Sequence, residues 1–99
     1  MELRFADKSP EALYTEEMAA DRYPSEVVDA FFRRMVLICS ARDERDLRAL
    51  KSARVEKLKG SDRYSIRLSR QWRLEFTFDP PQGPDKAVVV LAISKHYGD

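Results

Sequence analysis

The spacing of apolar residues changes from a helical period to a strand period about two thirds of the way along this chain. Between Val27 and Cys39 the apolar side chains recur every three or four residues, which is the spacing of one face of a helix. From Tyr64 to Phe78 they recur mostly every second residue, which is the spacing of strands with one buried face. The pattern therefore predicts helices in the first half of the chain and strands in the second.

Start signals divide the first half into short elements. Glu2–Phe5 alternates polar and apolar residues and predicts a first strand at an edge of the sheet. Ser9 and Pro10 predict the start of a first helix that runs to about Arg22, because serine can cap a helix and proline suits its first turn. Pro24 predicts the start of the second helix.

The second helix carries the clearest apolar stripe of the chain. The stripe consists of Val27, Val28, Phe31, Phe32, Met35, Ile38 and Cys39. A stripe of this width must lie on a broad surface, and it predicts a buried, inert thiol at Cys39. Asp43 predicts the cap of a short third helix with Leu47 and Leu50 facing inward.

The second half predicts three strands, of which the first two form a hairpin closed by Ser69-Arg70-Gln71. The inward positions of this hairpin are Tyr64, Ile66, Leu68, Trp72, Leu74, Phe76 and Phe78. We expect Trp72 to be largely buried between the sheet and the second helix, near Phe31 or Phe32. Ala87–Ser94 is apolar almost throughout and predicts a strand that is covered on both faces or lies in the centre of the sheet.

The resulting order is β-α-α-β-β-β, which predicts the α+β class. About four strands, rich in antiparallel pairs, would pack one face on the two N-terminal helices. We expect a single domain over residues 1–99, because this length is typical of one domain and no linker or repeat interrupts it.

Charge is distributed unevenly along the chain, although the net charge is only +1. Residues 48–73 hold nine Lys or Arg and two acids, which gives +7, whereas the other residues hold nine bases and fifteen acids, which gives −6. A cationic segment of this kind predicts a polyanionic or acidic binding partner.

The composition also excludes several classes of protein. A single cysteine cannot form an internal disulfide and fits a reducing compartment, and one distant histidine leaves no zinc-type ligand set. We therefore expect no metal and no other cofactor. The first residues do not resemble a signal peptide, and no apolar run approaches the ~20 residues of a membrane-spanning helix. A cytoplasmic protein without a membrane partner is expected.

The hairpin places two arginines in an unfavourable position. If its turn is centred on Arg70, Arg67 and Arg73 lie opposite each other on the face away from the helices, where like charges repel. Either Glu75 on the same face neutralises one of them, or an external anion such as a phosphate binds there. Both explanations are open at the level of the sequence.

Two further groups lie near this hairpin in the sequence. Lys57 and Lys59 flank Leu58, and they either project together toward the same anion or belong to an ordinary solvated loop. His96 and Tyr97 follow the last strand, and they either transfer protons or form a frayed tail in which Tyr97 packs on the sheet edge.

The second half of the chain resembles a known family. The segments K-L-K-G, R-Y-S-I-R-L and Q-W-R-L-E-F, followed by an apolar strand and a His-Tyr tail, resemble the RelE/ParE toxin superfamily and most of all its HigB-like, or plasmid maintenance killer, branch. The resemblance implies the RelE-like microbial-ribonuclease fold. It also implies a toxin of a type II toxin–antitoxin system, an mRNA interferase that cleaves mRNA on the ribosome and inhibits translation.

The same resemblance implies partners and site residues. The partners are a cognate helix-turn-helix antitoxin and mRNA on the ribosome, with operator DNA contacted only through the antitoxin. The phosphate-binding and acid–base positions fall on Lys57, Lys59, Arg67, Arg73, His96 and Tyr97. The chain departs from the branch at Glu56, where a histidine is usual, and in the order of its tail. A gyrase-inhibiting ParE-like toxin without nuclease chemistry and a catalytically weak module that binds RNA or protein are the alternatives.

Overall fold

Helices occupy most of the first half of the chain, and four of the five strands lie in the described part of the second half, as the periodicity predicts. The computed structural model describes residues 1–95. The strands are β1 (Glu2–Phe5), β2 (Glu56–Lys57), β3 (Tyr64–Arg67), β4 (Trp72–Asp79) and β5 (Ala87–Lys95). The α-helices are α1 (Lys8–Glu16), α2 (Ser25–Ser40) and α3 (Glu44–Ala49), and two 3₁₀ turns are η1 (Ala20–Arg22) and η2 (Lys51–Ala53).

A five-stranded mixed sheet has the order β1-β5-β4-β3-β2. β1 runs parallel to β5, and the other neighbouring strands are antiparallel. The predicted α+β class and the predicted edge position of the first strand are confirmed. The prediction of four strands missed β2, because a strand of two exposed residues has no apolar alternation to reveal it.

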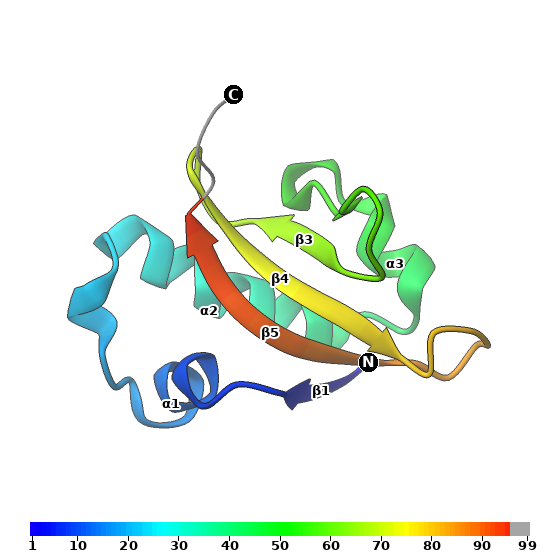
Figure 1. Cartoon of the computed structure of the whole chain (residues 1–99), viewed down its shortest axis with the longest axis horizontal. Helices are drawn as coiled ribbons and strands as arrows, with labels where there is room; N and C mark the ends of the chain where they lie inside the picture. The colour runs from blue at the N-terminus through cyan, green and yellow to red at the C-terminus, as the bar shows by residue number, and fades with distance from the viewer. Residues whose placement is uncertain (96–99) are drawn as a thin grey trace.

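The helix α2 lies behind the sheet in Figure 1 and supplies the centre of the core. Its buried side chains are Val27, Ala30, Phe31, Met35 and Ile38. They belong to one cluster with the inward side chains of the strands, Ile66, Leu74, Phe76, Val88 and Val90. In the described part of the chain, no helix lies in front of β3, β4 and β5 in this view, and we call this side of the sheet the open face.

The β3–β4 hairpin has the predicted register and the predicted faces. Ile66 lies opposite Leu74, and Arg67 lies opposite Arg73. Ile66, Leu74 and Phe76 are fully buried, so the inward positions are confirmed. Because side chains alternate along a strand, the two arginines belong to the open face.

Trp72 packs against the core with a small part of its surface exposed, as expected, but its aromatic partner differs from the prediction. Its ring meets Tyr23 edge to face with 5.4 Å between the ring centroids. Its aromatic partner is therefore Tyr23 instead of Phe31 or Phe32. The reason is position, since Trp72 is the first residue of β4 and the segment after η1 covers that end of the strand.

The first helix starts and ends earlier than predicted. It begins at Lys8 after Asp7, so Ser9 lies inside the helix and does not cap it. It ends at Glu16 because Glu17 adopts a left-handed backbone conformation with φ of 53°, and Ala19 does the same with φ of 63°. None of the helices in residues 1–95 is long and apolar enough to cross a membrane.

Two side chains that were expected inside lie at the surface. Cys39 is exposed, because it lies about 100° around the helix from the buried Ile38 and so at the rim of the apolar stripe. Leu50 is 41% exposed, because α3 ends at Ala49 and Leu50 no longer follows the helical face that buries Leu47.

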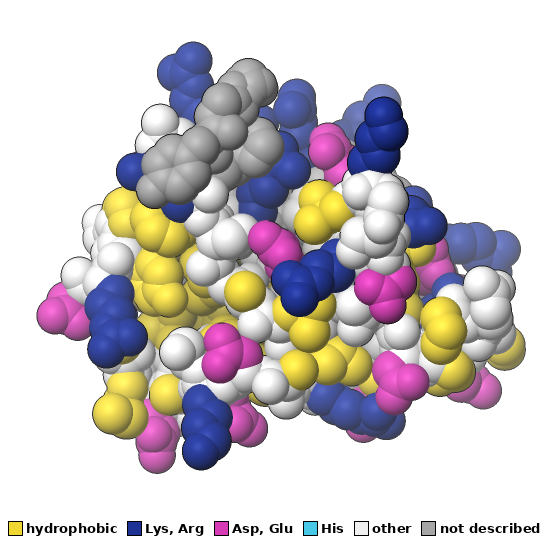
Figure 2. Space-filling view, viewed as in Figure 1, with side chains coloured by type: hydrophobic (Ala, Val, Ile, Leu, Met, Phe, Trp, Pro, Cys, Tyr) yellow, Lys and Arg dark blue, Asp and Glu magenta, His cyan; other side chains and the backbone are white. Residues whose placement is uncertain are grey.

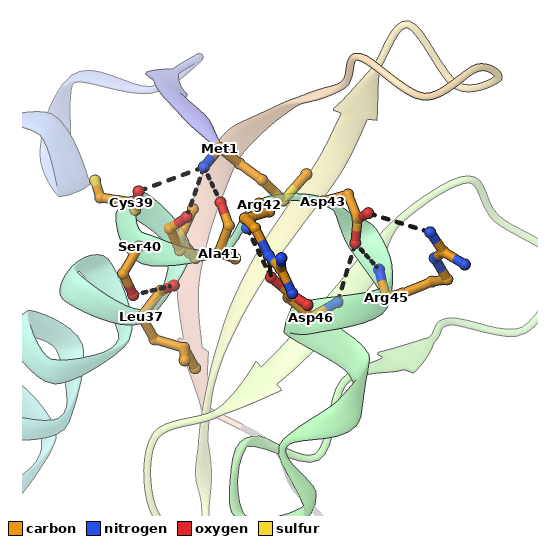
Figure 3. A network of polar contacts seen from close by, with 10 residues as sticks. Met1, Leu37, Cys39, Ser40, Ala41, Arg42, Asp43, Arg45 and Asp46 are labelled. Carbon is orange, nitrogen blue, oxygen red and sulfur yellow. Dashed lines mark hydrogen bonds and ion pairs between the residues drawn. The ribbon is translucent and has the colours of Figure 1, made fainter.

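Polar contacts stabilise the segment that connects α2 to α3 (Figure 3). The ammonium group of Met1 donates to the carbonyl oxygens of Ile38 at 3.2 Å and Cys39 at 3.4 Å, and also to that of Ala41. The Asp43 carboxylate accepts the backbone N–H groups of residues 45 and 46 at 3.0 and 3.2 Å. The predicted cap at Asp43 is therefore confirmed.

Candidate anion-binding face of the sheet

Arg67 and Arg73 form a cross-strand pair on the open face. The N–H of Leu68 donates to the carbonyl oxygen of Trp72 at 2.9 Å. Hydrogen-bonded and non-hydrogen-bonded pairs alternate along an antiparallel ladder, so the adjacent arginine pair is non-hydrogen-bonded, with Cα atoms about 4.5 Å apart. On its other side Arg73 lies opposite Ser94 of β5. We call the line of Arg67, Arg73 and Ser94 across the sheet the arginine row.

Glu75 lies on the same face but binds other partners. Its carboxylate accepts from Arg63 Nη1 at 3.0 Å and from Ser94 Oγ at 2.7 Å. Among the described residues, no carboxylate lies within ion-pairing distance of Arg67 or Arg73. The side-chain contact recorded for Arg67 is a bond from its Nε to the carbonyl oxygen of Ser69 at 3.3 Å. Glu75 therefore does not neutralise the pair in this structure.

The positive charge of residues 48–73 is mostly uncompensated. Two of its nine bases pair with carboxylates, Arg48 with Glu44 and Arg63 with Glu75. The seven bases of this segment that form no ion pair within residues 1–95 are Lys51, Arg54, Lys57, Lys59, Arg67, Arg70 and Arg73. Figure 2 shows Lys and Arg side chains gathered along the upper edge of the molecule, where the hairpin lies in Figure 1.

The structure does not bring Lys57 and Lys59 to the arginine row. Lys57 lies opposite Tyr64, so the alternation of side chains assigns it to the other face of the sheet, and it lines a pocket of about 540 Å³. Lys59 is exposed in the turn between β2 and β3. That turn precedes β3 at Tyr64, about 10 Å along the strand from Arg67.

The predicted acid–base residues His96 and Tyr97 come shortly after Ser94 of the arginine row in the sequence. β5 ends at Lys95, which pairs with Trp72, and its neighbour Ser94 belongs to the row. His96 and Tyr97 lie outside the described residues.

A carboxylate that the sequence did not single out as a site residue lies on the open face. Glu56 is opposite Ser65, and Ser65 is opposite Glu75, so alternation assigns these three to the open face beside the arginine row. Glu56 is exposed and, within residues 1–95, forms no ion pair. A two-residue strand gives no periodic signal, so its register could not be read from the sequence. No group of three or more His, Cys, Asp or Glu in this part of the chain is arranged to hold a metal ion.

Comparison with solved structures identifies the fold. The backbone is similar to that of the solved YoeB/ParE toxin from Agrobacterium tumefaciens, with a TM-score of 0.55 over 98% of this chain and 100% of that one. At 16% identity this similarity shows the fold alone. The chain therefore has the fold of the RelE/ParE-like toxins, which confirms the fold that the sequence resemblance implies.

Sequence comparison assigns the family. Residues 3–96 match the HigB-like toxin family, described as the RelE-like toxin of the type II toxin–antitoxin system HigB. The curated Toxin HigB-1 of Vibrio cholerae serotype O1 is 36% identical over 78 residues, which cover 77% of this chain and 82% of that protein. The chain belongs to the HigB-like toxin family, and membership in a toxin–antitoxin system implies a cognate antitoxin as its partner.

Proposed function

We propose that this toxin is a metal-independent endoribonuclease that cleaves mRNA on the ribosome and so inhibits translation. The observation that carries the proposal is the arginine row, in which Arg67 and Arg73 lie opposite each other on paired strands, and neither forms an ion pair with a carboxylate in residues 1–95. A phosphate of RNA bound there would relieve the repulsion and meet donors of fixed charge and forked geometry. The HigB-like family assignment supports a toxin activity of this kind.

The proposed reaction uses the 2′-hydroxyl of RNA as the nucleophile. Its oxygen bonds to the adjacent phosphorus while the bond from phosphorus to the 5′-oxygen breaks, which leaves a 2′,3′-cyclic phosphate and a 5′-hydroxyl. The step needs a base for the 2′ proton, an acid for the leaving oxygen, and cations for the charge that develops on the phosphate. Arg67 and Arg73 supply the cations from paired strands of the sheet.

The proton-transfer groups are assigned by position. Glu56 is proposed as the base, because it is an exposed carboxylate without an ion-pair partner in the described chain, and alternation puts it on the open face. His96 or Tyr97 is proposed as the acid, because both directly follow β5 in the sequence and either side chain can transfer a proton. Lys57 and Lys59, which lie away from the row, are proposed to bind phosphates further along the RNA.

The proposed partners follow from the same assignment. A helix-turn-helix antitoxin holds the toxin inactive and alone contacts operator DNA, while residues 1–99 act as one toxin domain. Action on ribosomes requires a cytoplasmic location. The uncompensated charge of residues 48–73 should make association with an acidic antitoxin segment fast and sensitive to salt.

Cleavage of mRNA on translating ribosomes by the purified toxin tests the proposal. Wild-type toxin should produce fragments with 5′-hydroxyl ends. Gyrase inhibition is the second candidate function, favoured by the departure from the branch pattern in the order of the tail residues. A supercoiling assay on the same preparation separates the two, since intact mRNA together with inhibited gyrase would reject the nuclease.

A further inference from the structure

Arg34 of α2 ties the helix layer to the back of the arginine row. Its Nε donates to the carbonyl oxygen of Arg67 at 3.0 Å, and its Nη2 donates to the carbonyl oxygen of Ser52 at 3.2 Å. Ser52 lies in η2, and Arg67 is the last residue of β3. A single guanidinium therefore links three segments that are distant in the sequence.

Arg34 binds backbone carbonyl oxygens instead of a carboxylate. The residue is partly buried, and no carboxylate in residues 1–95 forms an ion pair with it. Burial, and after it the positive charge of Arg33, lowers the pKa of Arg34 below the ordinary value of an arginine. A partly buried cation without a counter-ion is costly. A neutral donor could make the same two hydrogen bonds at a lower cost of desolvation.

We infer that Arg34 is a positioning residue for the arginine row and that it acts through Arg67, whose carbonyl oxygen it binds. This inference rests on the proposed nuclease function. Arg67 is held at two points, its carbonyl oxygen by Arg34 and its Nε by the carbonyl oxygen of Ser69 at 3.3 Å. Its terminal guanidinium nitrogens are left to meet a phosphate, and a group held in this way loses little freedom on binding.

Two substitutions separate the geometry from the charge. Arg34→Lys keeps the positive charge but loses the forked donation to two carbonyl oxygens. Arg34→Met keeps an apolar stem and removes both properties. In single-turnover cleavage of mRNA on programmed ribosomes, Arg34→Met should lower the maximal rate by about 10- to 100-fold, because small misplacements of catalytic groups cost rates of this order. Arg34→Lys should lie between Arg34→Met and the wild type.

A double-mutant cycle with Arg67→Ala distinguishes positioning from a general role in folding. If Arg34 acts through Arg67, Arg34→Met should change the rate by less than about threefold in the Arg67→Ala background. Arg48→Met is the matched control, because Arg48 pairs with Glu44 and lies 5.1 Å from the centre of the Tyr64 ring. It should lower stability and leave the rate of the folded toxin unchanged.

The possible results distinguish the positioning role of Arg34 from the nuclease function on which it rests. Equal losses for Arg34→Met in both backgrounds, or a wild-type rate for Arg34→Met, would overturn the positioning role while leaving the nuclease proposal intact. A wild-type toxin that leaves mRNA intact would reject the nuclease proposal and this inference with it. If Arg34→Met does not fold, the same cycle is run with Arg34→Lys, for which a loss confined to the background with Arg67 is the supporting result.

Discussion

Replacing Arg73 with glutamine should make the toxin more stable and less active at the same time. The paired Cα atoms lie about 4.5 Å apart, and side chains that splay outward would hold their charges roughly 7 Å apart. Two unit charges at ~7 Å repel by about 0.6 kcal/mol at the dielectric constant of water and by about 2.4 kcal/mol at an effective value of ~20. Arg67 and Arg73 are partly buried, so we expect the free energy of unfolding to rise by about 1 kcal/mol.

Urea denaturation at two salt concentrations measures this gain. It should be largest at roughly 0.01 M salt and should shrink at roughly 1 M, where the Debye length falls from ~30 to ~3 Å. Arg70→Gln is the matched control, because Arg70 is exposed at the tip of the same hairpin and lies outside the paired register. Its free energy of unfolding should stay within about 0.5 kcal/mol of the wild type.

A decrease in the free energy of unfolding of Arg73→Gln would refute the reasoning. If Arg73→Gln lowers the free energy of unfolding by more than about 1 kcal/mol at low salt, Arg73 stabilises the fold and its charge is already compensated. The case for an external anion at the arginine row would then lose its physical basis.

Two further predictions concern the core and the charged surface. Trp72→Ala should cost less than the ~3–5 kcal/mol expected for Phe76→Ala, because Trp72 is only partly buried and Phe76 is fully buried; urea denaturation of both variants compares them. Burial raises the pKa of Glu44, but hydrogen bonds from Lys86 and Arg48 outweigh burial and hold the pKa below its ordinary value of 4.5. The ionised Glu44 carboxylate therefore stabilises the fold above about pH 4.5, and this stabilisation is lost as the pH falls further. Glu44→Gln should lower the free energy of unfolding at pH 7, and the difference from the wild type should shrink when urea denaturation is repeated at increasingly acidic pH.

The parts of the fold that follow a regular period could be predicted from the sequence. The stripe of α2 and the faces of the β3–β4 hairpin follow from spacing alone, since side chains recur at fixed intervals in helices and strands. The opposition of Arg67 and Arg73 was predicted for the same reason, because a short connection leaves few possible registers. Because the register of the hairpin could be predicted, the position of the arginine pair in the candidate site could be predicted as well.

The features that depend on turns and on backbone acceptors could not be predicted in this way. The faces of Glu56 and Lys57 are set by the two-residue strand β2, whose pairing follows from the turn that leads into β3. The position of Trp72 depends on how the chain after η1 folds back over the strand end. The tie made by Arg34 ends on carbonyl oxygens, and every residue has one, so the sequence gives no sign of which are bound.

The rate of mRNA cleavage by Arg73→Ala, compared with that of Arg70→Ala, tests the central claim most directly. Both variants remove one positive charge from the same hairpin, but only Arg73 belongs to the arginine row. With matched amounts of folded toxin on programmed ribosomes, Arg73→Ala should be slower by about a hundredfold or more, and Arg70→Ala by no more than a few fold. Cleavage by Arg73→Ala at the wild-type rate would contradict the assignment of the arginine row as the phosphate site.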